Sequence, residues 1–492
     1  MTLRAACLTL AALAATACVG PHVPRAALEG WHSVAVGDVR VVAEASARET
    51  ELLASHLAGF DAAFAHLLGR RLAAQRPTTI FLIRGRELAG RFGLGSSAAG
   101  WAFGTLEASY ASVHSRARVE TRLTLFHEYT HLLLARQRES RMPRWYNEGL
   151  AEYFSTLAVR DGALVVGSVP FERLGWLAAS GPMPLDRLFG EVDLTHPKEV
   201  GGFYSTAWAL VHYRLGTPRG RGELSRFERE LAQGVPLDAA RERAFGRSFD
   251  ALAAELSTYI DYLRRGVSAS VVLDPSQIQI AEPPAPAPLA AFEVARELGL
   301  LALALTEESR EEGEEGGLLA LSRALLETAV EGDPGNARVR AGLAYARVLS
   351  GDAESAAAGI DRALRDASGD AEVLWHAGQI ALAGGALDEA EARFRGALAL
   401  DPRFASAWLG LGRALDRAGD TDAALEALAR ARSLAWSAAL DLEIGRLHLA
   451  AGRNDEALAV LQPLARDPHG GRTAERAAEL LREADLEPEV GD

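Results

Sequence analysis

Two helical stretches joined by a short turn decide how the N-terminal half of this chain folds: RLTLFHEYTHLLLARQ at residues 122–137 and WYNEGLAEYFSTLA at residues 145–158. Both carry apolar residues at helical spacing, and Pro143 between them marks a turn. His127 and His131 are four residues apart. Their imidazole rings therefore lie on one face of the first helix, with Cβ atoms about 5–6 Å apart.

Two histidines on one helix face can bind a single zinc ion. Zn²⁺ accepts nitrogen ligands at about 2.0–2.1 Å and takes four ligands, so a third protein ligand must come from elsewhere. Glu148 follows His131 after 16 intervening residues, which is enough for the chain to turn and send a second helix back. We expect His127, His131 and Glu148 to bind Zn²⁺ and to leave the fourth position for water.

Two further glutamates have places in this chemistry. Glu128 lies next to the first histidine and can take a proton from a zinc-activated water, which makes it the expected general base. Glu152 lies one turn beyond Glu148 and can orient the outer nitrogen of a liganding histidine. The structural alternative is that both histidines are partly buried helix residues paired with Glu148. That alternative explains the charges but not the spacing.

These segments resemble a known enzyme group. HEYTHLLL (127–134), PRWYNEGLAEYFS (143–155) and AFGRSFDALAAELSTYI (244–260) are similar to the gluzincin zinc peptidases, most closely to peptidase MA-like proteins. The resemblance implies an α+β zincin-like catalytic domain, a small sheet plus helices, over residues 30–268. It also implies a zinc-dependent metallopeptidase that hydrolyses peptide bonds, with the ligands and base named above. The substrate, a protein or peptide, is not specified by it.

The resemblance extends in part to the substrate pocket. FYSTAWALVHYRL (203–215) is similar to the segment that holds the oxyanion tyrosine of gluzincin aminopeptidases, which nominates Tyr204 as a catalytic residue. The alternative is that Tyr204 packs in the core, with Tyr213 nearby. The Gly-x-Met-Glu-Asn segment of those aminopeptidases is missing, and GSSAAGWAFG (95–104) occupies the comparable region.

The residues before this pair of helices predict a small α/β unit. Residues 33–43 and 78–83 are typical of strands, residues 47–68 of a helix and residues 93–104 of a glycine-rich loop. A third strand is expected near residues 109–114. It is either an edge strand on which an extended peptide can add itself, or an ordinary member of the sheet.

The C-terminal part has a different organisation. Five prolines within residues 274–288 predict an extended linker, placed at residues 269–289. In residues 290–487, Gly378 recurs as Gly412 and Ala390 as Ala424, 34 residues apart. This period resembles tetratricopeptide repeats, of which we count about four. It implies an all-α solenoid that binds a protein partner.

The N-terminus predicts export. Residues 1–18 have one early positive charge, an apolar run and small residues, which is typical of a signal peptide. Ala15-Thr16-Ala17-Cys18 resembles a bacterial lipoprotein cleavage box, so Cys18 is expected to carry lipid; plain secretion is the alternative. We expect a protein secreted across the inner membrane and held by lipid alone in the cell envelope, on the periplasmic face of the outer membrane.

Composition narrows the function further. A net charge of −14 argues against nucleic acid as a partner. Cys7 lies in the segment to be removed, so disulfides and thiol catalysis are excluded. Two hypotheses remain: a zinc peptidase whose repeats recruit a protein partner, or a catalytically idle lipoprotein adaptor whose repeats mediate envelope protein assembly.

Overall fold

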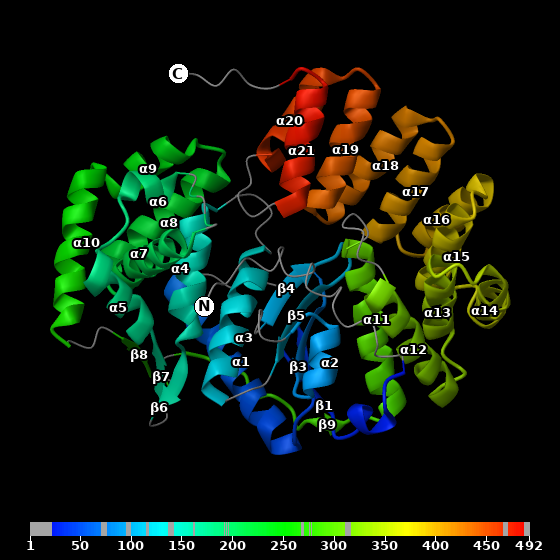
Figure 1. Ribbon diagram of the computed structural model, residues 1–492, viewed down its shortest axis with the longest axis horizontal. Helices are drawn as coiled ribbons and strands as arrows, with labels where there is room; N and C mark the ends of the chain where they lie inside the picture. The colour runs from blue at the N-terminus through cyan, green and yellow to red at the C-terminus, as the bar shows by residue number, and fades with distance from the viewer. Residues whose placement is uncertain are drawn as a thin grey trace.

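A six-stranded sheet forms the centre of the N-terminal domain (Figure 1). The computed structural model describes residues 22–69, 76–94, 100–114, 118–135, 142–160, 163–190, 192, 194, 196–266, 270–274, 276, 278–309, 316–465 and 471–486. The strand order is β4-β5-β3-β2-β1-β9. These strands are β1 (His32–Val36), β2 (Val39–Ala43), β3 (Thr78–Ile83), β4 (Gly100–Gly104), β5 (Ser109–His114) and β9 (Ala287–Pro288). The strands predicted at 33–43, 78–83 and 109–114 are confirmed.

The sheet is mixed, and its edge differs from the expectation. β2, β3 and β5 run parallel, whereas β4 is antiparallel to β5. Because β5 lies between β4 and β3, residues 109–114 are an ordinary member of the sheet, the second of the two alternatives considered above, and not an edge strand. The edge is β4, inside the segment expected to be a loop. Its sequence GWAFG lacks the β-branched alternation that marks a strand, so pairing with β5 rather than local propensity makes it one.

Helices cover both faces of the sheet. Val41 and Ile80 pack on the face covered by α1 (Ala47–Leu68) and α3 (Arg118–Ala135). Their neighbours Val42 and Phe81 belong to the opposite core, with residues of α11 (Ala291–Ser309) and α12 (Gly316–Gly332). Since side chains alternate along a strand, both faces of these strands are apolar and both are buried.

The helices that follow α3 complete the domain. α4 (Arg144–Ser155) packs against both α3 and α7 (Pro197–Leu215). A second sheet of three strands has the order β6-β7-β8. The remaining elements are α2 (Arg86–Arg91), β6 (Ala158–Arg160), β7 (Ala163–Val166), α5 (Phe171–Ser180), α6 (Leu185–Phe189), α8 (Pro218–Ala232), α9 (Leu237–Phe245), α10 (Phe249–Arg264) and β8 (Val271–Leu273). The helical run expected up to about residue 265 is present, interrupted by β6 and β7.

The proline-rich segment is extended but lies against the N-terminal domain. β8, at its start, pairs with β7, and β9, at its end, pairs with β1. Arg40 on β2 donates a hydrogen bond of 2.7 Å to Glu297 on α11. The domain bounds 30–268, 269–289 and 290–487 stay predictions, and the two main parts share one hydrophobic core across the sheet.

The C-terminal part is a helical solenoid, as the period predicted. Within the described residues it has five helix pairs and a final helix, one pair more than our count of about four. After α11 and α12 these helices are α13 (Ala337–Leu349), α14 (Ala353–Asp366), α15 (Ala371–Ala383), α16 (Leu387–Leu400), α17 (Ala405–Arg417), α18 (Thr421–Leu434), α19 (Ala438–Ala450), α20 (Asn454–Ala465) and α21 (Gly471–Glu483). The array curves around the N-terminal domain (Figure 1).

The recurring glycines allow the two helices of a pair to pack closely. A Cβ atom on Gly378 would lie 2.6 Å from the Phe394 ring, and one on Gly412 would lie 2.6 Å from Leu428. Cβ atoms in real structures essentially never come so close, so an alanine at either position would require the facing side chain or the helices themselves to move. This close approach is the physical reason for the 34-residue recurrence.

The turn between β4 and β5 docks on the array. Leu106, 7% exposed, belongs to the hydrophobic core of α15 to α20. Next to it, Glu107 accepts a hydrogen bond of 2.7 Å from the backbone N–H of Ser406. Trp375 on α15 donates to the backbone oxygen of the same serine at 3.2 Å. The edge strand of the sheet is thereby attached to the inner helices of the repeats.

This contact replaces a missing helix cap. α13 and α15 begin after Asn336 and Asp370, whose side chains accept hydrogen bonds from the first turn. The residue one period later, at the start of α17, is Phe404, which makes no side-chain cap. Glu107 accepts from the first turn of α17 in its place. The N-terminal domain thus supplies a group that the repeat itself lacks.

In the described part of the chain, no helix is both long and apolar enough to cross a membrane. The predicted signal peptide, with Cys18, lies outside the described residues.

Candidate metal centre

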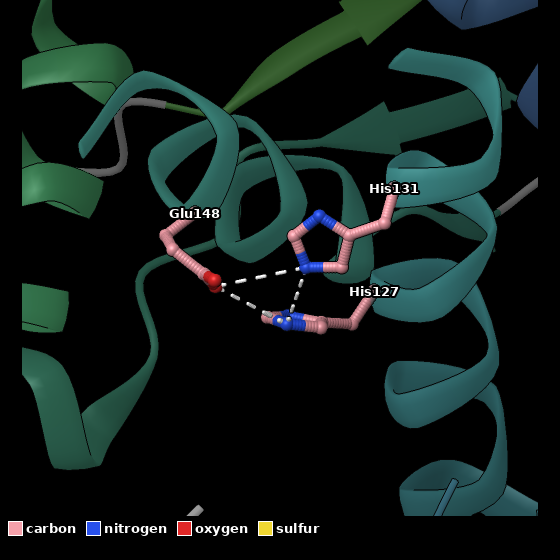
Figure 2. Close-up of side chains that lie close together, drawn as sticks. All are labelled: His127, His131 and Glu148. Atoms are coloured by element: carbon pink, nitrogen blue, oxygen red, sulfur yellow. Dashed lines mark hydrogen bonds and ion pairs between the residues drawn. The ribbon is translucent and has the colours of Figure 1, made fainter. Parts of the chain in front are cut away.

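Three predicted ligands converge between α3 and α4. His127 and His131 extend from α3 toward Glu148 on α4 (Figure 2). Their Nε2 atoms are 3.2 Å apart. Glu148 Oε2 lies 3.5 Å from Nε2 of His127 and 3.7 Å from Nε2 of His131. In the described residues this is the one group of three or more His, Cys, Asp or Glu side chains with metal-ligand spacing.

The spacing and the donor types fit a small divalent cation. Ligands at about 2.05 Å from a tetrahedral zinc are about 3.3 Å from one another. The three distances between the ligand atoms lie within about 0.4 Å of that value. Two imidazole nitrogens and one carboxylate oxygen are donors that zinc accepts. Zinc binding itself stays a prediction.

Local packing explains why α3 presents its histidines at this place. Phe126 and Tyr129 lie on the buried side of α3 and contact Phe60 of α1, with ring centroids 4.8 and 5.3 Å apart. The Tyr129 hydroxyl also donates to Asp61 at 2.8 Å. These anchors fix the rotation of α3, so that His127 faces α4.

Gly149 brings α4 close to α7. A Cβ atom at this position would lie 2.6 Å from the backbone oxygen of Ala207, so only glycine fits without a shift of the backbone. Since Gly149 directly follows Glu148, this contact sets the position of the carboxylate ligand relative to α7, the helix of Tyr204.

Glu128 is a buried carboxyl group beside the ligands, 8% exposed. Burial raises the pKa of Glu128 to about 7, the positive charge of His127 opposes the rise, and Glu148 adds to it. A carboxyl group with a pKa near neutrality can accept a proton and return it, which suits a general base. A bound cation would lower that pKa.

His127 is held by carboxylates on two sides. Burial lowers the pKa of His127, but the hydrogen bond and charge of Glu148, together with the charges of Glu152 and Glu128, raise it to about 9. Glu152 Oε1 lies 3.8 Å from Nδ1 of His127, longer than a hydrogen bond. The predicted orienting contact is therefore close but not formed.

Arg173 is a residue that our sequence analysis missed. From α5 it donates two hydrogen bonds to Glu152, at 3.0 and 2.6 Å, and so fixes this carboxylate beside His127. Its guanidinium also lies 5.3 Å from the centre of the Tyr204 ring. No spacing in the sequence links residue 173 to the two motifs, so only the packing of α5 against α7 reveals it.

Tyr204 is buried, 5% exposed, and belongs to the domain core. Burial raises its pKa, Glu148 and Glu152 raise it further, and Arg144 and Arg173 oppose them. In the described residues its hydroxyl has no hydrogen-bond partner. Tyr204 therefore has both features considered above: a ring packed in the core and a hydroxyl within electrostatic reach of a metal ligand.

Comparison with known proteins identifies the repeats. The family model for a tetratricopeptide repeat matches residues 318–375 and 381–435. The C-terminal region therefore contains tetratricopeptide repeats, which in general bind proteins. The match does not extend to the N-terminal domain, so the gluzincin resemblance stays a prediction. No curated protein matches the chain.

One solved structure that resembles part of the chain is also a tetratricopeptide-repeat protein. A thermophilic tetratricopeptide-repeat protein of Thermus thermophilus is 21% identical, with a TM-score of 0.33, and covers 37% of this chain and 99% of its own. PilF of Pseudomonas aeruginosa is 19% identical, with a TM-score of 0.28, and covers 38% and 92%. Since both TM-scores are low, the assignment of the repeats rests on the family model.

Proposed function

We propose that this protein is a zinc-dependent peptidase of the bacterial cell envelope. The observation that carries the proposal is the convergence of His127, His131 and Glu148 beside the buried carboxyl group of Glu128. Structural zinc sites are closed by four protein ligands, whereas catalytic sites have three and leave one position for water. A base next to three ligands is needed for hydrolysis and not for a structural site.

The reaction would divide between the cation and the protein. When bound, Zn²⁺ lowers the pKa of water and polarises a carbonyl group. Glu128 would accept the proton of the attacking water and then donate it to the leaving amine. Arg173 would hold the Glu152 carboxylate close to Nδ1 of His127. The Tyr204 hydroxyl would donate a hydrogen bond to the oxygen that becomes negatively charged.

The repeats would bring a protein to this domain. Tetratricopeptide repeats occupy residues 318–435, and we propose that they recruit a protein partner or substrate. The first pairs of the array are packed on the sheet, and the turn at Leu106 and Glu107 contacts the inner helices α15 and α17. The surface for a partner must therefore lie on helices, or on helix faces, that the sheet does not cover.

The adaptor hypothesis is the second candidate. The comparisons support protein binding more directly than hydrolysis, because the family model matches the repeats alone. In this case the cation site would be idle and the chain would assemble other envelope proteins. For both candidate functions, we propose that the protein is exported and carries a lipid on Cys18.

Replacement of Glu128 by Gln distinguishes the two candidates. We expect purified Glu128→Gln to keep one equivalent of zinc and to digest a peptide library at least ~100-fold more slowly than the wild type. Chelator should abolish the wild-type digestion, and added zinc should restore it. Glu172→Gln, an exposed glutamate of the same domain, is the matched control and should keep full activity. Equal rates for Glu128→Gln and wild type would refute the assignment of the base.

A further inference from the structure

Arg144 is a cation without a carboxylate partner at the start of α4. Among the described residues it forms no ion pair, and its buried Nε atom has no hydrogen-bond partner. The neighbouring cation Arg173 is, in contrast, fully engaged by Glu152. The guanidinium of Arg144 lies 5.4 Å from the centre of the Phe203 ring, a contact that leaves its fork of N–H donors unused.

Its position relates it to the candidate metal centre. Arg144 precedes Glu148 by four residues, so both side chains lie on the same face of α4. Arg144 and Glu148 also act with opposite sign on Tyr204, which follows Phe203 on α7. The arginine therefore lies beside the oxyanion candidate and one helical turn from the carboxylate ligand.

We propose that Arg144 binds a carboxylate group of the substrate, an inference that rests on the peptidase function proposed above. The side chain of Arg144 is half-buried and its Nε–H group is buried without a partner, which is unfavourable, and a carboxylate pairs with a guanidinium through two parallel hydrogen bonds. One helical turn is about 5.4 Å and an extended peptide rises about 3.4 Å per residue, so this carboxylate lies within about two residues of the cleaved bond. The source is either the free C-terminus of a peptide or an Asp or Glu side chain.

The test uses the full-length protein and two peptide series. Members of the first series end in a free carboxylate or in an amide, and members of the second carry Asp and Glu or Asn and Gln two residues after the scissile bond. We expect wild type to favour one carboxylate series about 10- to 100-fold in kcat/KM, and Arg144→Met to lose that preference. Arg144→Lys, which keeps the charge but not the fork, should recover part of it.

Controls separate this inference from the proposed function. Arg187→Met, which removes a half-exposed arginine paired with Glu199, should leave the preference unchanged. Zinc content of Arg144→Met should equal that of wild type. Binding of the same peptides to zinc-loaded Glu128→Gln protein, with and without Arg144→Met, measures recognition without turnover.

The outcomes are distinct. If peptides are cleaved and neither carboxylate series is preferred, or if Arg144→Met keeps the preference, the role of Arg144 is refuted and the peptidase stands. If no peptide is cleaved but carboxylate peptides bind and Arg144→Met abolishes that binding, the peptidase is refuted and Arg144 remains a carboxylate site. A preference for the free acid over the amide identifies the C-terminus as the source, and a preference for Asp and Glu identifies a side chain.

Discussion

Replacing Glu107 by Ala should detach the edge strand of the sheet from the repeats. The backbone N–H of Ser406 would lose its acceptor inside an interface where Leu106 is 7% exposed. Loss of a helix cap destabilises by about 0.5–2 kcal/mol, and a buried donor left without a partner by about 1–3 kcal/mol. Since both figures describe the same hydrogen bond, we expect about 1–3 kcal/mol for opening of this contact.

Hydrogen exchange on the full-length protein measures that opening. A change of about 1–3 kcal/mol corresponds to about 5- to 150-fold faster exchange, expected both in the first turn of α17 and in β4. Glu107→Gln keeps an acceptor and removes the ionisable group whose pKa burial raises, so its effect should be smaller. Leu106→Ala should also destabilise the contact between the turn and the repeats, by about 2–5 kcal/mol.

A cap elsewhere in the array provides the matched control. Asp352 accepts from Ser355 at 3.2 Å and caps α14. Asp352→Ala should speed exchange at the start of α14 and leave β4 unchanged. If Glu107→Ala speeds exchange in α17 alone and leaves β4 unchanged, the hydrogen bond of Glu107 does not hold the edge strand on the repeats.

Two further predictions concern the metal and the pH. Glu148→Gln removes a direct ligand, so it should bind zinc more than ~100-fold more weakly than wild type in a competition titration. Glu152→Gln should bind zinc ~10- to 100-fold more weakly. Equal zinc affinity of wild type and Glu148→Gln would exclude the site. Burial lowers the pKa of His212 and of His376 to about 4, below the unfolded value of 6.5, so the unfolded chain takes up protons first and stability is lost as pH falls from 6.5 toward 4. Thermal unfolding at pH ~5 should show that the free energy of unfolding falls by about 2 kcal/mol per histidine, and by less in total in His212→Gln. A loss in His212→Gln as large as that in wild type would contradict the role of His212.

Much of the local structure could be predicted because its signals are short in range. The helix of residues 47–68 begins with a capping box of Ser46 and Glu49, and it has the predicted bounds. The glycine at residue 378 recurs because each repeat presents the same close contact between its two helices. Likewise, His127 and His131 share a face wherever their helix lies in the fold.

What the residue order alone could not decide depends on contacts between distant segments. β4 forms a strand only because it pairs with β5, and Arg173 reaches Glu152 because α5 and α4 both pack against α7. The capping of α17 by Glu107 joins residues 299 positions apart. No pattern within a few residues records such a pair.

The amino-acid sequence by itself determined the two kinds of architecture, a helix that carries two histidines and an array of paired helices, because period and spacing act through neighbouring residues. The tertiary structure decided that Arg173 pairs with Glu152 while Arg144 has no carboxylate partner among the described residues, and that the turn after β4 contacts the array. These outcomes follow from burial and packing, whose free energies depend on the final positions of segments far apart in the chain.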